Sequence, residues 1–539
     1  MTPPPTAGDA AAAGRGGVRR PRADRVGSDA VPGIPRPRGV TPRQLAELAA
    51  RLRLEPPAGA DAAAVTGVSA ASGDVRPGDL YAALPGARRH GAEFVAQAAA
   101  AGARAVLTDP AGAPAAAAAG LPALVVPDPR AVLGELASRV YGEPSAALTV
   151  IGLTGTAGKT STAYLVESGL RAAGRRTGLI GTVETRIADL RLDSVRTTPE
   201  APDLHALLAV AVESGVDAVV MEVSSHALAL GRVGGVRFAV GGWTNFGSDH
   251  LDFHADAADY FAAKARLFDG RCAVEVLNHD DPALAPLRRP ATVTYSAAGD
   301  PAATWRAVEV TGAQAHRFTA VGPGGAAVPA GVALPGRHNV ANALLAIAAL
   351  AAVGVDPRVA ADGVAALRVI PGRLERVAAP GPVLGVVDYA HKPDAVVAVL
   401  TALRAVAVER GGRLICVLGA GGDRDRAKRP LMGHAAAQGA DQVVITDDNP
   451  RTEEPAAIRA ELLAGARSAA SGAEIRDVPG RRAAIAEAVA GARPGDVVAV
   501  LGKGHERGQE VAGEVLPFDD RDELAAALAA RFADAGSAR

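Results

Sequence analysis

The sequence predicts an α/β protein of three domains. Its 539 residues exceed the roughly 250 to 300 that a single hydrophobic core accommodates. Short β-branched runs alternate with alanine-rich helical stretches along most of the chain, a pattern typical of parallel sheets covered by helices. One glycine-rich loop joins a strand directly to a helix. We therefore expect a small α/β domain, a central domain with a phosphate-binding loop and a mostly parallel sheet, and a C-terminal Rossmann-like domain.

The first domain is predicted over residues 41–145. Apolar runs at 79–84, 105–108 and 123–127 read as strands, and 92–101 reads as a helix. Alanine fits a helix and a low-complexity tract equally well, so the alanine run at 115–119 is ambiguous. Residues 1–40 are rich in Pro, Gly, Ala and Arg, and we predict a disordered tail there.

The central domain is predicted over residues 146–372. It opens with the β-branched run 148–153, continues through a helix at 161–173, and includes a strand at 218–223. The longest apolar run, 343–355, is shorter than the roughly 20 residues that cross a bilayer. We expect it to be a buried core helix.

The C-terminal domain is predicted over residues 373–539. Its apolar runs, each followed by polar or glycine-rich residues, lie at 383–387, 413–419, 442–446 and 496–501. In open parallel sheets, functional groups gather at the carboxyl ends of the strands. We therefore expect a second site where these strands end.

Charge and cysteine content limit the classes of partner. The 57 Lys and Arg residues balance the 58 Asp and Glu residues, so no overall field favours nucleic acid or anionic lipid. Cys272 and Cys416 lie in apolar contexts that suit buried free thiols in a reducing compartment. We expect a cytoplasmic monomer that binds no nucleic acid and has no membrane span.

The glycine-rich loop predicts a nucleotide site. Backbone N–H groups, a helix N-terminus and an ammonium group together suit a polyphosphate. Lys159 would neutralise the β- and γ-phosphates of ATP, and the Thr160 hydroxyl would bind Mg²⁺. The alternative is a plain strand-to-helix turn with an incidental lysine. The spacing also departs from the common form, because Leu153 stands where a first glycine would be. The predicted ATP-binding residues of the loop are Gly155, Thr156, Ala157, Gly158, Lys159, Thr160 and Ser161.

Three downstream strings, 221–226, 245–254 and 260–268, carry further ionisable groups. Glu222 ends a β-branched strand, where a carboxylate can hold magnesium. His250 and His254 stand four residues apart beside aspartates, a spacing that suits either a zinc site or a solvated helix. Lys264 follows in an aromatic helical stretch and, taken alone, reads as a surface lysine.

These three strings, in this order, resemble motifs of the Mur ligase family, whose loop reads Gly-Thr-x-Gly-Lys-Thr. The resemblance implies that Thr160, Glu222 and His250 hold Mg²⁺, and that Lys264 carries a carbamate. Carbamylation replaces an ammonium by an anion with two oxygens, which helps to position the metal. The catalytic residues implied are Lys159, Glu222, His250 and Lys264.

The resemblance extends to contacts with both nucleotides. It implies that Asn339, Arg373 and Asp388 contact ATP. In the first domain the usual Asp-Ser-Arg is replaced by 71–73, Ala-Ser-Gly, so Ser72 alone remains as a contact to the uridine nucleotide. The residues implied to bind the sugar and diphosphate of that substrate are Thr197, Thr198, Ser224 and Arg232.

Two strings in the third domain, 421–430 and 446–455, resemble the corresponding motifs of family members that add the third residue of the cell-wall peptide. The string 446–455 together with 502–506 marks those that add diaminopimelate. This amino acid differs from lysine by a distal carboxylate, which a guanidinium grips through two hydrogen bonds. A site built this way would reject lysine by about 10⁴-fold. The diaminopimelate-binding residues implied are Arg424, Asp448, Asn449, Pro450, Arg451, Gly502 and Glu506.

The implied reaction is ATP-dependent amide ligation. The D-glutamate side-chain carboxylate of a UDP-N-acetylmuramoyl dipeptide forms an acyl phosphate, and the amine of diaminopimelate displaces phosphate; we expect the meso isomer, although these residues do not separate meso from LL. Rivals are a lysine-adding or D-alanyl-D-alanine-adding ligase, and a folylpolyglutamate synthase. A phosphate-loop kinase or motor and a silent nucleotide-binding protein are rivals from other classes.

Overall fold

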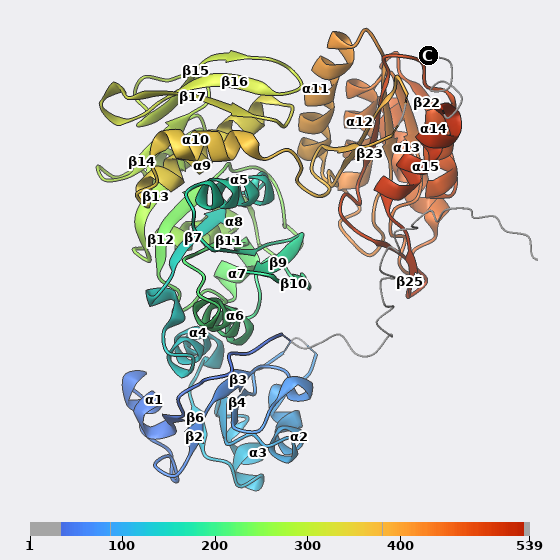
Figure 1. The fold of residues 1–539 in the computed structure, drawn as a ribbon. Coiled ribbons are helices and arrows are strands. Elements are labelled where there is room, and N and C mark those ends of the chain that lie inside the picture. The colour runs from blue at the N-terminus through green and yellow to red at the C-terminus, as the bar shows by residue number, and fades with distance from the viewer. Residues whose placement is uncertain (1–33, 87, 380, 533–539) are drawn as a thin grey trace, which may run out of the picture. The chain divides into compact units, whose positions relative to one another are not determined.

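The computed structural model describes residues 34–86, 88–379 and 381–532, and Figure 1 shows their helices and strands. Three sheets account for most of the strands, and each is built from one continuous part of the chain. This arrangement confirms the α/β fold class.

The first sheet is small and wholly parallel. Its four strands pair in chain order and are flanked by four helices. The alanine run at 115–119 forms most of a helix here. The strands are β3 (Gly67–Ser69), β4 (Asp79–Ala82), β5 (Ala105–Thr108) and β6 (Ala123–Val125), and the helices are α1 (Leu45–Arg51), α2 (Val95–Ala100), α3 (Ala113–Ala118) and α4 (Pro129–Val140); β1 (Arg43–Gln44) and β2 (Ala64–Val65) pair separately.

The second sheet has eleven strands. They are β7 (Thr149–Thr154), β8 (Thr177–Ile180), β9 (Glu184–Ile187), β10 (Leu190–Asp193), β11 (Ala218–Glu222), β12 (Phe238–Trp243), β13 (Cys272–Asn278), β14 (Val293–Ser296), β15 (Trp305–Thr311), β16 (His316–Val321) and β17 (Ala327–Val332). The order is β10-β9-β8-β11-β7-β12-β13-β14-β15-β16-β17. Pairing is parallel from β8 to β15 and antiparallel at both ends, so the predicted mostly parallel sheet is confirmed.

Helices cover both faces of the central strands. Ile151 and Leu153 of β7 pack into one core with α5 (Lys159–Ala172), α9 (Arg337–Ala352) and α10 (Pro357–Ala366). Val150 packs into the opposite core with α6 (Ala201–Glu213). Because both faces are buried, the strand sequence is continuously apolar rather than alternating. The run at 343–355 lies largely within α9, as predicted. Two short helices complete this part of the chain, α7 (Ser225–Ala229) and α8 (Ala257–Ala265).

The third sheet has six strands in the order β18-β19-β23-β20-β21-β22, all parallel except β18. Leu414 and Leu418 face one core, with α11 to α13, while Ile415 and Val417 face the other, with α14 and α15. The elements are β18 (Glu375–Val377), β19 (Leu384–Asp388), β20 (Leu414–Leu418), β21 (Gln442–Ile445), β22 (Glu474–Asp477), β23 (Val497–Leu501), α11 (Pro393–Glu409), α12 (Lys428–Gly439), α13 (Pro455–Ser468), α14 (Arg481–Ala490) and α15 (Asp520–Phe532). A separate hairpin of β24 (Gly508–Val511) and β25 (Glu514–Pro517) lies between β23 and α15 in the chain.

One expectation about the N-terminal tail is wrong in its boundary. Residues 1–33 lie outside the described part of the chain, but 34–40 are placed against the fold. Arg36 pairs with the buried carboxylate of Asp79, and the Arg38 backbone N–H donates to Glu213 Oε1 at 3.0 Å. These contacts join residues far apart in sequence, so composition alone did not indicate them.

Both cysteines are free and buried, as predicted, and burial raises the pKa of each thiol to about 12. Among the described residues, no helix combines the length and the apolar character that crossing a membrane requires.

Candidate active site

The carboxyl ends of three neighbouring central strands form the first part of the site. In the order β11-β7-β12, these strands end at Glu222, Thr154 and Trp243. The loop 155–158 therefore emerges beside the segments that follow β11 and β12. Side chains from distant parts of the sequence meet at this edge, as the sheet topology predicts.

The phosphate loop is held tightly against the segment after β12. The Ala157 N–H donates to Asn245 Oδ1 at 3.0 Å, and Thr244 Oγ1 donates to the Ala157 carbonyl at 2.6 Å. Gly155 has φ 138°, and a Cβ there would lie 1.9 Å from Thr244 Oγ1. Glycine is thus required because the loop approaches the Thr244 hydroxyl closely. Helix α5 starts immediately after the loop, so its first N–H groups lack intrahelical partners and suit an anion.

Two lysines share one carbonyl at this loop. Lys159 Nζ donates to the Gly155 carbonyl at 2.8 Å, and Lys264 Nζ donates to the same oxygen at 2.9 Å. Burial lowers the pKa of Lys159 to about 8, and burial followed by repulsion from Lys159 lowers the pKa of Lys264 well below its ordinary value. Neither ammonium has a carboxylate partner within salt-bridge distance among the described residues. Both amines therefore lack a direct carboxylate partner within the part of the site that the structure describes.

The structure contradicts the surface-lysine interpretation of Lys264. Its side chain is buried, with 1% of the residue exposed, and Nζ lies 4.5 Å from the centre of the Tyr260 ring. Lys264 reaches the phosphate loop from α8, more than one hundred residues away in sequence. The aromatic residues around it pack the helix inward, a feature that the local sequence pattern did not distinguish from an ordinary amphipathic helix.

Glu222 and Thr160 form a compact oxygen site. Thr160 Oγ1 donates to Glu222 Oε1 at 3.0 Å, and the Thr182 N–H donates to the same oxygen at 2.8 Å. Glu222 is 1% exposed and has no cationic partner within salt-bridge distance among the described residues. A buried carboxylate without a countercharge is costly. A divalent cation bound by these oxygens would supply that charge, so the residues fit Mg²⁺.

The histidine string lies before α8 rather than on a solvated helix. His254 is 2% exposed, and its Nδ1 lies 3.1 Å from Asp259 Oδ2. His250 Nε2 lies 3.0 Å from Asp249 Oδ2, and its ring stands 4.7 Å from that of His226. Within residues 34–532 as described, no three His, Cys, Asp or Glu side chains are grouped so as to hold a metal ion. The zinc alternative gains no support from this geometry.

The residues expected to contact the uridine nucleotide fall into two places. Thr198 Oγ1 accepts from the Ser224 N–H at 3.1 Å, and Arg232 Nη1 donates to the Thr198 carbonyl at 3.3 Å. Thr197 Oγ1 lies 3.0 Å from the Thr182 hydroxyl, next to Glu222. Ser72 lies in the first sheet region, where its hydroxyl donates to Gln97 Oε1 at 3.1 Å.

Of the three remaining ATP candidates, Arg373 points to the phosphate loop. Its Nη2 donates to Thr160 Oγ1 at 3.2 Å. The Asn339 amide is buried and donates to the Pro335 carbonyl at 2.8 Å. Asp388 is buried and accepts from the Leu374 and Ala390 N–H groups. The latter two side chains thus shape the backbone around the site.

The amino-acid candidates gather at the carboxyl ends of β20, β21 and β23. Lys503 Nζ donates to Asn449 Oδ1 at 2.9 Å and lies 3.1 Å from Glu506 Oε2. Gly502 has φ 117°, and a Cβ there would lie 2.3 Å from Asp448 Oδ2. Glycine at this position therefore lets the strand end approach the Asp448 carboxylate. Pro450 leads into Arg451, whose Nε donates to Glu510 Oε2 at 3.0 Å.

A cavity of about 560 Å³ joins this cluster to the central site. Its polar lining includes Arg424, Arg451, Asp448, Glu506 and His250. Sequence reasoning missed two other lining residues, Lys392 and Asp249, whose side chains form an ion pair. Nothing in the local sequence of either residue identifies a partner 143 positions away.

Three family models match the chain. The Mur ligase middle domain matches residues 153–350, the Mur ligase glutamate ligase domain matches 372–504, and the Mur ligase family catalytic domain matches 64–141. The chain belongs to the Mur ligase family.

Particular relatives narrow the comparison. A protein of Streptomyces coelicolor named UDP-N-acetylmuramoyl-L-alanyl-D-glutamate--2,6-diaminopimelate ligase is 57% identical over 504 residues, which span 92% of this chain and 98% of the relative. A Corynebacterium glutamicum protein of the same name is 48% identical, over 83% of this chain and 89% of the relative. A solved structure of a ligase with this name superposes with a TM-score of 0.65 at 31% identity, covering 91% of this chain and 99% of the other.

Proposed function

We propose that this chain is an ATP-dependent ligase that adds diaminopimelate to the D-glutamate side-chain carboxylate of UDP-N-acetylmuramoyl-L-alanyl-D-glutamate. The observation that carries the proposal is the cavity in which Arg424, Arg451 and Glu506 share one space with His250. His250 follows closely after Gly247, whose N–H donates to Thr156 of the phosphate loop at 3.0 Å. A zwitterionic amino acid and an activated carboxylate can meet there. The 57% identity to a ligase of this name supports the same substrates.

Lys159 and the start of α5 are positioned to bind the polyphosphate of ATP. The dipeptide carboxylate attacks the γ-phosphorus, the bond to the ADP oxygen breaks, and an acyl phosphate forms. Lys159 and Arg373 stabilise the charge that spreads over the phosphoryl oxygens. Thr160, Glu222 and His250 would hold Mg²⁺, which neutralises phosphate charge when bound.

The second step forms the amide. The amine of diaminopimelate attacks the acyl carbonyl, giving a tetrahedral intermediate that expels inorganic phosphate as the nitrogen loses a proton. Arg451 and Arg424 grip the distal carboxylate, and Glu506 and Asp448 accept from the distal ammonium. Binding at both ends fixes the amine close to the carbonyl, which supplies much of the rate enhancement.

We propose that Lys264 is carbamylated. Its Nζ is buried beside the phosphate loop and donates to the same carbonyl oxygen as Lys159. Within the described part of the chain, no carboxylate lies within salt-bridge distance of it. The neutral amine attacks carbon dioxide, an N–C bond forms and one proton is released, so that a carbamate anion replaces the amine beside the Lys159 ammonium. The two groups then attract each other, and the carbamate would offer Mg²⁺ another oxygen ligand.

Uridine-nucleotide binding is assigned to Ser72, Thr197, Thr198, Ser224 and Arg232, and ATP binding to the loop 155–161 with Asn339, Arg373 and Asp388. We propose the domain boundaries 41–145, 146–372 and 373–539, with residues 34–40 lying against the folded chain. We also propose a cytoplasmic location and a monomer.

The test is phosphate release from ATP with each substrate omitted in turn. We expect release only when the UDP-dipeptide and diaminopimelate are both present, with the tripeptide product identified by mass. Parallel reactions with meso-diaminopimelate, LL-diaminopimelate and L-lysine define the amine. Release that does not depend on any amino acid would overturn the ligase proposal, and preference for lysine would overturn its specificity.

A further inference from the structure

Two neighbouring loops carry the arginines assigned to the distal carboxylate. The loop 419–427 follows β20 and contains Arg424, and the loop 446–454 follows β21 and contains Arg451. The strands β20 and β21 pair in parallel, so both loops emerge at the same edge of the sheet. Bidentate recognition requires both guanidinium groups to be held within about 0.5 Å of their productive positions. Something must therefore fix one loop against the other.

Each loop contains a non-glycine residue in the left-handed backbone region. Asp423 has φ 52° and Arg451 has φ 54°. Such conformations are unfavourable and persist only where surrounding contacts hold them. They turn the chain sharply just before Arg424 and at Arg451, and thereby set the direction in which each arginine leaves its loop.

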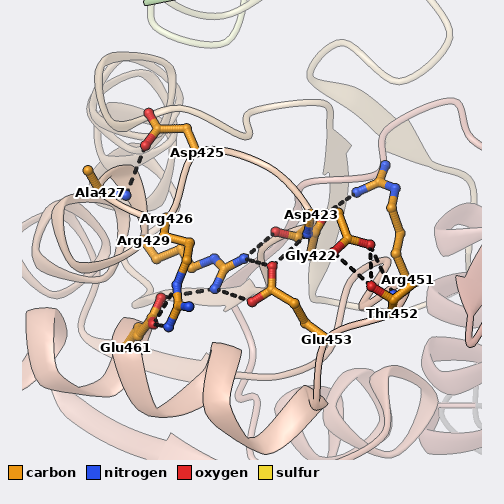
Figure 2. Close-up of polar contacts among 11 residues, drawn as sticks. Gly422, Asp423, Asp425, Arg426, Ala427, Arg429, Arg451, Thr452, Glu453 and Glu461 are labelled. Carbon is orange, nitrogen blue, oxygen red and sulfur yellow. Dashed lines mark hydrogen bonds and ion pairs between the residues drawn. The ribbon is translucent and has the colours of Figure 1, made fainter. Parts of the chain in front are cut away.

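Direct contacts join the loops, and Figure 2 shows them. The Asp423 carboxylate accepts from the Thr452 N–H at 3.0 Å and from its hydroxyl at 2.9 Å. Arg451 Nη1 donates to the Gly422 carbonyl at 2.7 Å. A Cβ at Gly422 would lie 1.9 Å from the Pro450 carbonyl oxygen, so the two backbones are in close contact.

Arg429 supports the contact between the two loops. It is 0% exposed, and its two terminal nitrogens donate to the two oxygens of Glu453 at 2.9 and 2.7 Å. Glu453 Oε1 also accepts from the Asp423 N–H at 2.6 Å, and Arg429 Nη2 donates to the Gly421 carbonyl at 3.1 Å. One buried guanidinium thus holds a side chain of one loop and the backbone of the other (Figure 2).

None of these bracing side chains lines the cavity. Arg424, Arg451, Gly421 and Asn449 do, whereas the side chains behind them do not. Their effect on a substrate must therefore pass through the two arginines. The bracing side chains are Asp423, Arg429, Thr452 and Glu453.

We propose that Asp423, Arg429, Thr452 and Glu453 form a clip that positions Arg424 and Arg451, so that this clip sets the selectivity for an amino acid with a distal carboxylate. The inference rests on the proposed function and deepens it. These four are positioning residues, because they act through the two arginines. If the clip is loosened, the two arginines lose their contacts to the distal carboxylate, whereas the ATP site is unchanged.

Glu453→Gln and Thr452→Val test the clip in full-length protein. Glu453→Gln removes the charge that Arg429 and the Asp423 N–H share, and we expect the KM for diaminopimelate to rise about tenfold. Thr452→Val removes one hydroxyl at nearly constant volume, and we expect a rise of about threefold. In both variants the KM for ATP stays unchanged. The preference for diaminopimelate over lysine falls by the same factor as the KM rises.

Glu461→Gln is the matched control. Glu461 Oε2 also accepts from Arg429, at 3.0 Å, and Glu461 pairs with the exposed Arg426 of the loop 419–427. It lies on α13 and has no hydrogen bond to the loop 446–454, so it does not join the two loops. We expect its KM for diaminopimelate to change less than about twofold.

Each outcome separates the clip from the proposed function. If wild-type protein releases no phosphate in response to diaminopimelate, the proposed function fails. If wild-type protein is active but Glu453→Gln and Thr452→Val leave the KM and the selectivity unchanged, the clip is refuted. The clip is also refuted if Glu461→Gln raises the KM for diaminopimelate as much as the two clip variants do, or if those variants raise the KM for ATP equally. A general loss of stability predicts either result. Should Glu453→Gln fail to fold, Thr452→Val decides.

Discussion

The nucleotide site and the amino-acid site differ in whether their charged side chains have oppositely charged partners. At the nucleotide site, Lys159, Lys264 and Glu222 are bonded to carbonyls, hydroxyls and N–H groups, with no oppositely charged partner within salt-bridge distance among the described residues. At the amino-acid site, Arg451 is paired with Glu510 at 3.0 Å and Lys503 with Glu506 at 3.1 Å.

This difference follows from what each site is proposed to bind. Polyphosphate and Mg²⁺ bring large charges of their own, so a site that leaves its charges uncompensated gains most when they arrive. A zwitterionic amino acid brings equal and opposite charges. Its site gains selectivity from the placement of groups that are already partly neutralised. Substitutions at the first site should therefore reduce turnover, and substitutions at the second should reduce selectivity.

Lys159→Met should have the largest effect. It removes the ammonium that we propose faces the transferring phosphoryl group, and we expect kcat to fall at least about 10³-fold. Phosphate release at saturating substrates measures it. Arg171→Met, at an exposed position on the same helix, serves as the control. A fall of less than tenfold would remove Lys159 from the phosphoryl-transfer step.

Lys264→Ala should have the second-largest effect, a fall in kcat of about 10² to 10³-fold. Because the carbamate is an anion, acetate or formate should restore part of the activity, whereas Lys264→Arg should not respond to either. Labelled bicarbonate and carbon NMR would detect the carbamate in the wild-type protein. Full activity in Lys264→Ala would rule out the carbamate as a necessary group.

Arg451→Ala should alter selectivity more than turnover. We expect the KM for diaminopimelate to rise about 10²-fold, because two charge-assisted hydrogen bonds are lost, with the KM for ATP unchanged. Arg451→Lys keeps the positive charge but loses the two parallel donors of the guanidinium. Its KM for diaminopimelate should therefore stay close to that of Arg451→Ala. Arg467→Ala, at an exposed position on α13, is the control. Equal loss with lysine and diaminopimelate would contradict the assignment.

The smallest expected effect is on stability alone. Arg481 and Asp520 are both 0% exposed, and Arg481 Nε donates to Asp520 Oδ1 at 2.7 Å. Arg481 Nη1 also lies 3.8 Å from Asp448 Oδ2, so Asp520→Asn leaves the buried guanidinium with only this longer ion pair. The substitution should lower the free energy of unfolding by about 3 kcal/mol. Urea unfolding measures it. Asp362→Asn, at the exposed Arg358 pair, should change that free energy by no more than about 0.5 kcal/mol. Similar losses in the two variants would show that burial does not govern these pairs.

Local sequence was sufficient where one short segment carries both the structure and the chemistry. The strand, loop and helix around Lys159 follow from a β-branched run, two glycines and a lysine within a dozen residues. The strands that end near Gly419, Thr446 and Gly502 were likewise predicted by their apolar runs. In both regions the sheet topology then brings the loops together.

Contacts between distant segments could not be predicted in this way. The antiparallel strands β9, β10 and β15 to β17 lie at the edges of the central sheet and lack the continuous apolar runs of its middle. The pairing of Lys392 with Asp249, and the burial of Lys264, depend on tertiary packing that no local pattern encodes. Arg36 likewise finds Asp79 across the first domain.

The most direct measurement is the ratio of kcat/KM for diaminopimelate to that for L-lysine, at saturating ATP and UDP-dipeptide. If Arg424 and Arg451 bind the distal carboxylate, this ratio should be about 10⁴. A ratio near one, or a preference for lysine, would contradict the account of both sites.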